Sequence, residues 1–207
     1  MRLILASNNA HKIAELRHLF ADGAVELAGL SDWPEIPEPP ETQDTFAGNA
    51  LQKARFVFER TGIMTVSDDS GLVVDALNGA PGVHSKRWTP EGTAESNNVR
   101  LLQEMEGVTV RNARFVCAMA VVWSGGERVI ESTCEGSIAT APRGGGGFGY
   151  DPLFLPTDRP GRTMAQLGPE DKNTISHRGR AFSHLPALLQ EISRVRRSTS
   201  PGDDRCR

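Results

Sequence analysis

Residues 113–138 read ARFVCAMAVVWSGGERVIESTCEGSI, and this stretch decides the fold class. Its two halves, 113–122 and 128–138, are rich in apolar and β-branched residues, which favour strands. Ser124-Gly125-Gly126 between them predicts a tight turn, so the two strands pair as an antiparallel hairpin. Because helices and strands mix along the rest of the chain, the sequence predicts an α/β protein with a mixed β-sheet rather than a purely parallel one.

Working outward from the hairpin, apolar spacing predicts the remaining elements. The expected strands and helices are short strands over 3–6, 63–67 and 153–155, and helices over 12–20, 45–60, 94–105 and 179–195. In the first helix, Ile13, Leu16, Leu19 and Phe20 fall on one face at helical spacing. We expect residues 1–197 to form one domain and the polar segment 198–207 to be a disordered tail.

Composition excludes several classes of protein. The chain has 207 residues and a formal charge of -3, so we expect it to bind duplex DNA poorly, because such binding requires many neutralised phosphates. Its longest apolar run, Phe115–Trp123, is far shorter than the ~20 residues of a membrane span. The three cysteines show no CxxC spacing, which argues against a zinc site or a disulfide framework. These features favour a reduced, cytoplasmic protein without nucleic-acid or membrane partners.

The strongest chemical signal is Asp68-Asp69-Ser70-Gly71, which we expect where the strand over 63–67 ends. Ligands of open α/β sheets bind beyond the carboxyl ends of strands, and carboxylates there suit Mg²⁺. Because neighbouring strand residues point to opposite faces, only one of the two aspartates should face a given site. The alternative is an ordinary turn rich in Asp, Ser and Gly.

Two further patterns place polar groups near helix ends. The segment 7–12, SNNAHK, lies between the first strand and the first helix, where free backbone N–H groups attract anions and Lys12 adds charge. A plain helix cap is the alternative. Asn49 and Lys53 share one helix face, and Glu41 precedes that helix, where it can join a metal site; all three otherwise read as a solvated face.

Two later motifs complete the set of candidates. Four glycines, 144–147, precede Phe148-Gly149-Tyr150-Asp151, in which the two aromatic rings can stack on a base. The alternative is a flexible hairpin loop. The segment 172–179, KNTISHRG, gathers cationic and titratable side chains at the start of a helix, where basic groups oppose the helix dipole unless an anion lies nearby.

Together, these motifs resemble the inosine triphosphate pyrophosphatase family over residues 3 to about 190. The resemblance is carried, in order, by SNNAHK (7–12), ETQDTFAGNALQKA (41–54), SDDSGLVVDALNGAPGVHS (67–85), GFGYDPLF (147–154) and KNTISHRG (172–179). It implies an elongated fold of two lobes with a central active-site cleft. It also implies Mg²⁺-dependent hydrolysis of aberrant purine nucleoside triphosphates (ITP, dITP and XTP) to monophosphate and pyrophosphate, by a homodimer.

Carried over by position, the resemblance also assigns roles. It implies that Asp69 is catalytic and shares Mg²⁺ with Glu41. The residues that it implies bind substrate are Ser7, Asn8, Asn9, Ala10, His11, Lys12, Lys53, Ser70, Phe148, Gly149, Tyr150, Asp151, Lys172, His177 and Arg178. One departure concerns the metal, because Gly48 stands where the family often has Glu, so that Glu41 or Asp68 must compensate if that Glu is a ligand.

Two other functions are compatible with the same motifs. A non-enzymatic sensor would bind ITP without releasing pyrophosphate. A related pyrophosphatase would prefer modified pyrimidine or methylated nucleotides, and a substrate panel distinguishes it. For the hydrolase, we expect water to attack the α-phosphorus in line, with Asp69 taking or orienting the proton.

Overall fold

The computed structural model describes residues 1–8, 12–13, 16, 20 and 25–199. One six-stranded sheet organises them, in the order β2-β1-β3-β4-β5-β6. The strands are β1 (Arg2–Leu5), β2 (Glu26–Gly29), β3 (Thr65–Val74), β4 (Asn112–Trp123), β5 (Gly126–Ile138) and β6 (Phe154–Pro156). β1 pairs in parallel with β2 and β3, and the later pairs are antiparallel, which confirms the mixed sheet.

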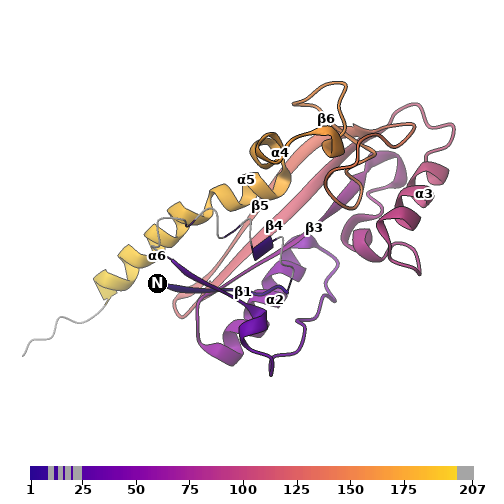
Figure 1. Ribbon diagram of the computed structural model, residues 1–207. Coiled ribbons are helices and arrows are strands. Elements are labelled where there is room, and N and C mark those ends of the chain that lie inside the picture. Colours follow the sequence, from indigo (N-terminus) through magenta and orange to yellow (C-terminus); the bar gives the residue numbers. More distant parts are fainter. Residues whose placement is uncertain (9–11, 14–15, 17–19, 21–24, 200–207) are drawn as a thin grey trace, which may run out of the picture.

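The helices lie on both sides of this sheet (Figure 1). They are α2 (Phe46–Thr61), α3 (Ala94–Glu104), α4 (Pro169–Ile175), α5 (His177–Ser183) and α6 (Leu185–Thr199). Four short 3-10 helices join them: η1 (Leu30–Asp32), η2 (Asp75–Leu77), η3 (Gly82–Arg87) and η4 (Met164–Gln166). Within the described ranges, no helix combines the length and apolarity needed to cross a bilayer.

The predicted hairpin is the longest feature of the sheet. β4 and β5 pair from Asn112 opposite Ser137 to Trp123 opposite Gly126, with the turn between them. Gly126 has φ 150, in the region that favours glycine. Both faces of β4 carry apolar side chains that the flanking helices cover, so the strand is buried along almost its whole length.

The predicted end of the strand at Ser67 is wrong. β3 continues through the two aspartates to Val74 and pairs with β4 over its whole length, from Thr65 opposite Val122 to Val74 opposite Ala113. The polar run does not break the strand, because the long partner β4 supplies backbone hydrogen bonds on one edge. Asp68 and Asp69 therefore lie in the middle of a central strand rather than in a turn.

Helix α2 covers one face of β3 and β4. It starts where Thr45, as expected for an N-cap residue, accepts a hydrogen bond from Gly48 N, and it ends at Gly62 with φ 66. Ala50 and Ala54 pack on Ala118 and Ala120, and these small side chains let the helix lie close to the sheet. The close approach brings Asn49 and Lys53 of α2 against Asp69 in the middle of β3.

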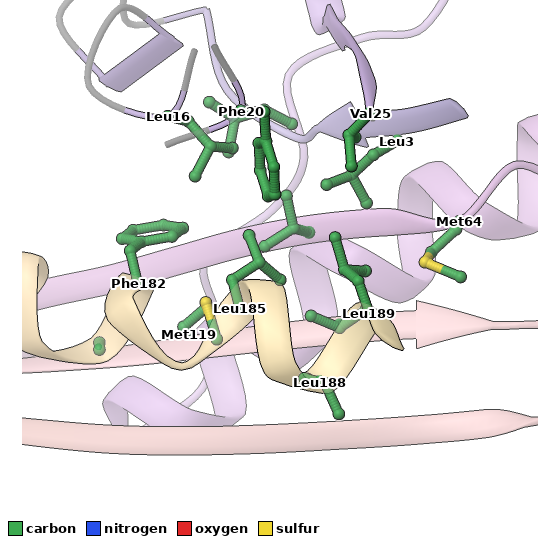
Figure 2. Packing of buried hydrophobic residues seen from close by; sticks show 14 of the residues in the cluster. Leu3, Leu16, Phe20, Val25, Met64, Met119, Phe182, Leu185, Leu188 and Leu189 are labelled. Atoms are coloured by element: carbon green, nitrogen blue, oxygen red, sulfur yellow. The ribbon is translucent and has the colours of Figure 1, made fainter. Parts of the chain in front are cut away.

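The single C-terminal helix predicted over 179–195 is instead two helices. α5 ends at Ser183 and α6 starts at Leu185, because Pro186 lacks an N–H and its ring excludes a continuous helix through this point. Leu185, Leu188 and Leu189 still face the core as predicted (Figure 2). α6 extends to Thr199, beyond the predicted start of the tail, and residues 200–207 lie outside the described residues.

The other side of the same cluster comes from the N-terminal segment. Leu16 and Phe20 are buried against Leu3 and Phe182, as the predicted first helix requires (Figure 2). Lys12, Ile13 and Leu16 have helical geometry, whereas Leu19 lies outside the described residues. The sequence did not predict β2 or α4, which are short and have little periodicity of their own.

Candidate active site

A cleft of about 670 Å³ crosses the middle of the sheet, a size that suits a nucleotide-sized ligand. Every described member of the predicted site borders it. These residues are Ser7, Asn8, Lys12, Glu41, Lys53, Asp69, Ser70, Phe148, Gly149, Tyr150, Asp151, Lys172, His177 and Arg178. The other three predicted members, Asn9, Ala10 and His11, lie outside the described residues.

Asp69 faces α2, because its cross-strand partner Ala118 belongs to the cluster packed on that helix. Asn49 Nδ2 donates to Asp69 Oδ2 at 3.0 Å, and Lys53 Nζ lies 3.7 Å from Oδ1. Burial raises the pKa of Asp69 above its ordinary value, although Lys53 and Asn49 oppose the shift. A carboxylate with a raised pKa and fixed orientation is suited to accept a proton.

Glu41 meets the same lysine from the loop before α2. Lys53 Nζ donates to Glu41 Oε1 at 2.6 Å, and Arg87 Nη1 lies 3.1 Å from Oε2. Burial alone would raise the pKa of Glu41, but Lys53 and Arg87 together hold it below its ordinary value. Arg87 Nη2 also reaches the backbone carbonyl of Glu41 at 3.3 Å, so Glu41 is held at two points.

Glu41 and Asp69 suit a small divalent cation. Both carboxylates contact one ammonium group, Lys53 Nζ, so the negative charge of two side chains is gathered on one side of the cleft. The described residues contain no group of three or more His, Cys, Asp or Glu side chains around one point. Two carboxylates are nevertheless the usual protein share for Mg²⁺, which completes its shell with water and substrate phosphates.

Gly48, the departure from the family pattern, has a local packing reason. A Cβ at this position would lie 2.8 Å from Gln43 Cβ and 2.9 Å from Thr45 Oγ1, so any side chain requires this turn to shift. Gln43 is itself fixed, since its N–H donates to Asn49 Oδ1 at 2.9 Å. A Glu does not fit at position 48 in this arrangement of the loop.

Asp68 faces the opposite side of β3, because its cross-strand partner Met119 belongs to the cluster under α6. The side chain is completely buried, and Lys12 Nζ lies 2.7 Å from both of its oxygens. Burial would raise the pKa of Asp68, but Lys12 and Arg178 outweigh it and hold the pKa well below its ordinary value. The two aspartates thus point to opposite faces, as strand alternation predicts.

The loop after the glycines is built around a buried ion pair. Asp151 Oδ2 accepts from Lys172 Nζ at 2.5 Å and from Phe148 N at 2.8 Å. Phe148 is 53% exposed as a whole residue, and Lys172 Nζ lies 4.5 Å from the centre of its ring. Phe148 is therefore placed to stack on a flat ligand.

Tyr150 differs from the expectation that both aromatic rings stack on a base. Its ring is buried in the cluster that contains Leu153 and Phe154, and its hydroxyl donates to Ser85 O at 2.8 Å. Burial also raises the pKa of the Tyr150 hydroxyl, which stays protonated. Tyr150 borders the cleft but anchors the loop to η3, and only Phe148 is exposed enough to stack.

His177 lies in the first turn of α5, whose N-cap is Ser176. The ring stacks on Phe115 with centres 4.8 Å apart, and its Nδ1 has no hydrogen-bond partner among the described residues. Burial and the neighbouring Arg178 lower the pKa of His177 well below its ordinary value, so the ring is neutral. A buried, neutral imidazole with an unused nitrogen is suited to a polar ligand atom.

Sequence reasoning missed several residues that support the site. Arg87 follows the motif at 67–85 by two positions, and no local pattern connects it with Glu41. Asn97 on α3 donates to Ser85 O at 3.2 Å and accepts from Thr89 N at 2.9 Å, which fixes η3. Asn98 donates to Gly149 O at 2.9 Å. Only contacts through space identify these three residues.

Comparisons with known proteins identify similar sequences and structures. The model of the Ham1 family matches residues 3–188. A "dITP/XTP pyrophosphatase" of Geobacillus kaustophilus is 48% identical over 194 residues, covering 92% of this chain and 95% of that protein. A HAM1 protein from Coxiella burnetii has a similar structure, with TM-score 0.87, 37% identity and coverage of 92% and 99%. A "Nucleoside-triphosphatase / dITP/XTP pyrophosphatase" from Mycobacterium abscessus gives TM-score 0.77, 46% identity and coverage of 89% and 98%.

Proposed function

This chain belongs to the Ham1 family, and on that basis we propose that it hydrolyses dITP, XTP and ITP to the nucleoside monophosphate and pyrophosphate. The observation that carries the proposal is the convergence of the five motifs on one cleft. Cations, a carboxylate with a raised pKa and an exposed aromatic ring all border it. These are the groups that a triphosphate, an attacking water and a purine base require.

Asp69 acts on the attacking water. Its carboxylate takes or orients a proton as the water oxygen bonds to the α-phosphorus and the bond from that phosphorus to the bridging oxygen breaks. Asn49 and Lys53 support this role, because their contacts with the two Asp69 oxygens fix the direction of the carboxylate. The pyrophosphate leaves with the electrons of the broken bond.

Glu41 and Asp69 would hold Mg²⁺, which when bound supplies positive charge to the phosphate oxygens and the leaving group. Lys12 and Lys53 contribute charge to the same region without proton transfer. Ser7 and Asn8 border the cleft between β1 and the helical residues Lys12 and Ile13, and we place the phosphates along this segment.

Phe148 would stack on the purine, while His177 and Arg178 would contact its edge. Hypoxanthine and xanthine carry an oxygen at C6, where adenine carries an amino group. A site that donates a hydrogen bond to this oxygen leaves polar groups unpaired when adenine binds, and such mismatches discriminate strongly. The unpartnered Nδ1 of His177 supports a polar contact here.

We further propose that the enzyme is a cytoplasmic homodimer. The nucleotide pool that supplies its substrate lies in the cytoplasm, and Cys117 and Cys134 are free, buried thiols. The dimer rests on the family resemblance alone, and sedimentation equilibrium tests it.

One assay tests the function. Pyrophosphate release is measured from dITP, XTP, ITP, GTP and ATP, with and without Mg²⁺. We expect release from the first three with Mg²⁺ and little from ATP, and Asp69→Asn should abolish it while circular dichroism remains unchanged. Binding of ITP without release would favour a sensor, and faster release from modified pyrimidine or methylated nucleotides would favour the related pyrophosphatase.

A further inference from the structure

Asp68 is a buried acid for which the reaction described above has no role. Its side chain is completely buried in the middle of β3, and both of its oxygens lie 2.7 Å from Lys12 Nζ. Arg178 Nε lies 3.5 Å from Oδ2 on the same carboxylate. One acid therefore contacts two cations of the proposed substrate site, one near each end of the chain.

These two cations need a fixed partner. The side chains of Lys12 and Arg178 are only 17% and 12% exposed, so solvent alone cannot satisfy or orient them. Lysine and arginine side chains also have many rotamers, and ordering them costs entropy at the moment of binding unless it is done in advance. Asp68 orders both side chains before the ligand binds, and it is itself held in β3, which pairs along its whole length with β4.

A hydrogen-bond chain continues from Asp68 to the cleft. Arg178 Nη2 donates to Ser70 Oγ at 3.4 Å, and Ser70 Oγ lies 3.5 Å from Asp68 Oδ2. Ser70 and Arg178 both border the cleft. The position of the guanidinium group is thus set from β3 at two points rather than one.

We propose that Asp68 is a positioning residue, which orients Lys12 and Arg178 toward the nucleotide rather than binding the metal. The proposal rests on the proposed function and assigns the neighbouring aspartates different tasks. Asp69 lies on the α2 face with Asn49 and Lys53, whereas both oxygens of Asp68 are directed to Lys12 on the other face. A metal ligand at Asp68 would require Lys12 to leave it.

The test separates the two tasks with Asp68→Asn. Its amide places an N–H group against the donors of Lys12, so the ammonium must move. We expect kcat/KM for dITP to fall on the order of a hundredfold, a loss that a displacement of about 1 Å in the site can cause. Binding of Mn²⁺ to the nucleotide-free protein, measured by electron paramagnetic resonance, should stay as in the wild type. Asp75→Asn, which removes an exposed acid paired with Arg114, is the matched control and should change neither.

A double-mutant cycle checks that Asp68 acts through the lysine. In a Lys12→Met background, Asp68→Asn should cost much less than in the wild type, because one of its two targets is already absent. Asp68→Glu keeps the charge but extends the side chain by one methylene. It guards against a variant that fails to fold, and it too should lose turnover while retaining Mn²⁺.

Several results would overturn the proposal. They are loss of Mn²⁺ binding in Asp68→Asn, wild-type turnover in Asp68→Asn or Asp68→Glu, and costs that simply multiply in the double mutant. Failure of the proposed function looks different, because the wild-type protein itself would then release no pyrophosphate. In that case weaker calorimetric binding of dITP to Asp68→Asn than to the wild type would still support positioning, and equal binding would refute it.

Discussion

Gly147→Ala should damage the nucleoside side of the cleft. Gly147 has φ +74, a backbone conformation that costs a residue with a Cβ about 1–2 kcal/mol. The new Cβ would also collide with Asp151 Oδ2 and lie 3.0 Å from Lys172 Nζ. Asp151 must then move, which weakens its bonds to Lys172 and to Phe148 N.

The magnitude follows from these two effects. Weakening a charge-assisted hydrogen bond adds about 1.5–3 kcal/mol to the strain, so we expect the free energy of unfolding to fall by about 2.5–5 kcal/mol. Phe148 loses its backbone anchor, and kcat/KM for dITP should fall on the order of a hundredfold. Urea unfolding and steady-state pyrophosphate release measure the two quantities.

Two other glycines provide controls. Gly161 has φ +80 with nothing within 4 Å of a Cβ, so Gly161→Ala measures the backbone strain alone. Gly145 has open space and no such φ, so Gly145→Ala should change little. If Gly147→Ala loses no more stability than Gly161→Ala and keeps full turnover, the role assigned to the Asp151 ion pair is incorrect.

Two further predictions concern stability and pH. Arg111 donates to four backbone carbonyls where α3, β4 and β5 meet, so Arg111→Met should lower the free energy of unfolding by about 2–4 kcal/mol in urea without changing KM. Burial raises the pKa of Asp69 and Lys53 opposes it, so activity should fall on acidification as this carboxylate is protonated. Removing the opposing charge in Lys53→Met should move the acid limb of kcat/KM to higher pH, whereas an unmoved limb would mean that another group titrates.

The sequence predicts the fold best where periodicity is long. Residues 113–138 carry two strands and a turn signal, and the structure confirms all three. The prediction failed at β3, because Asp68 and Asp69 disfavour a strand locally, whereas Lys12, Asn49 and Lys53 stabilise them from elsewhere in the chain. A local sequence pattern does not show which distant residues will stabilise the two aspartates.

In the candidate site, the identity of the residues was predictable, whereas their individual contacts were not. The motifs predicted its members because their residue types and order match a family, and every described member borders the cleft. Which partner each side chain takes was not predictable. Tyr150 is an anchor rather than a stacking ring, and Arg87 reaches Glu41 across the cleft. Pro186 is a case in which a signal was present, since proline in a first helical turn marks a new start.

The walls of the cleft come from segments as far apart as Ser7 and Arg178. During synthesis, the amino-terminal wall leaves the ribosome long before the last wall does. A nascent chain therefore has no nucleotide chemistry until nearly all of it has been translated, and a truncated product that ends before α5 should be inert rather than partly active.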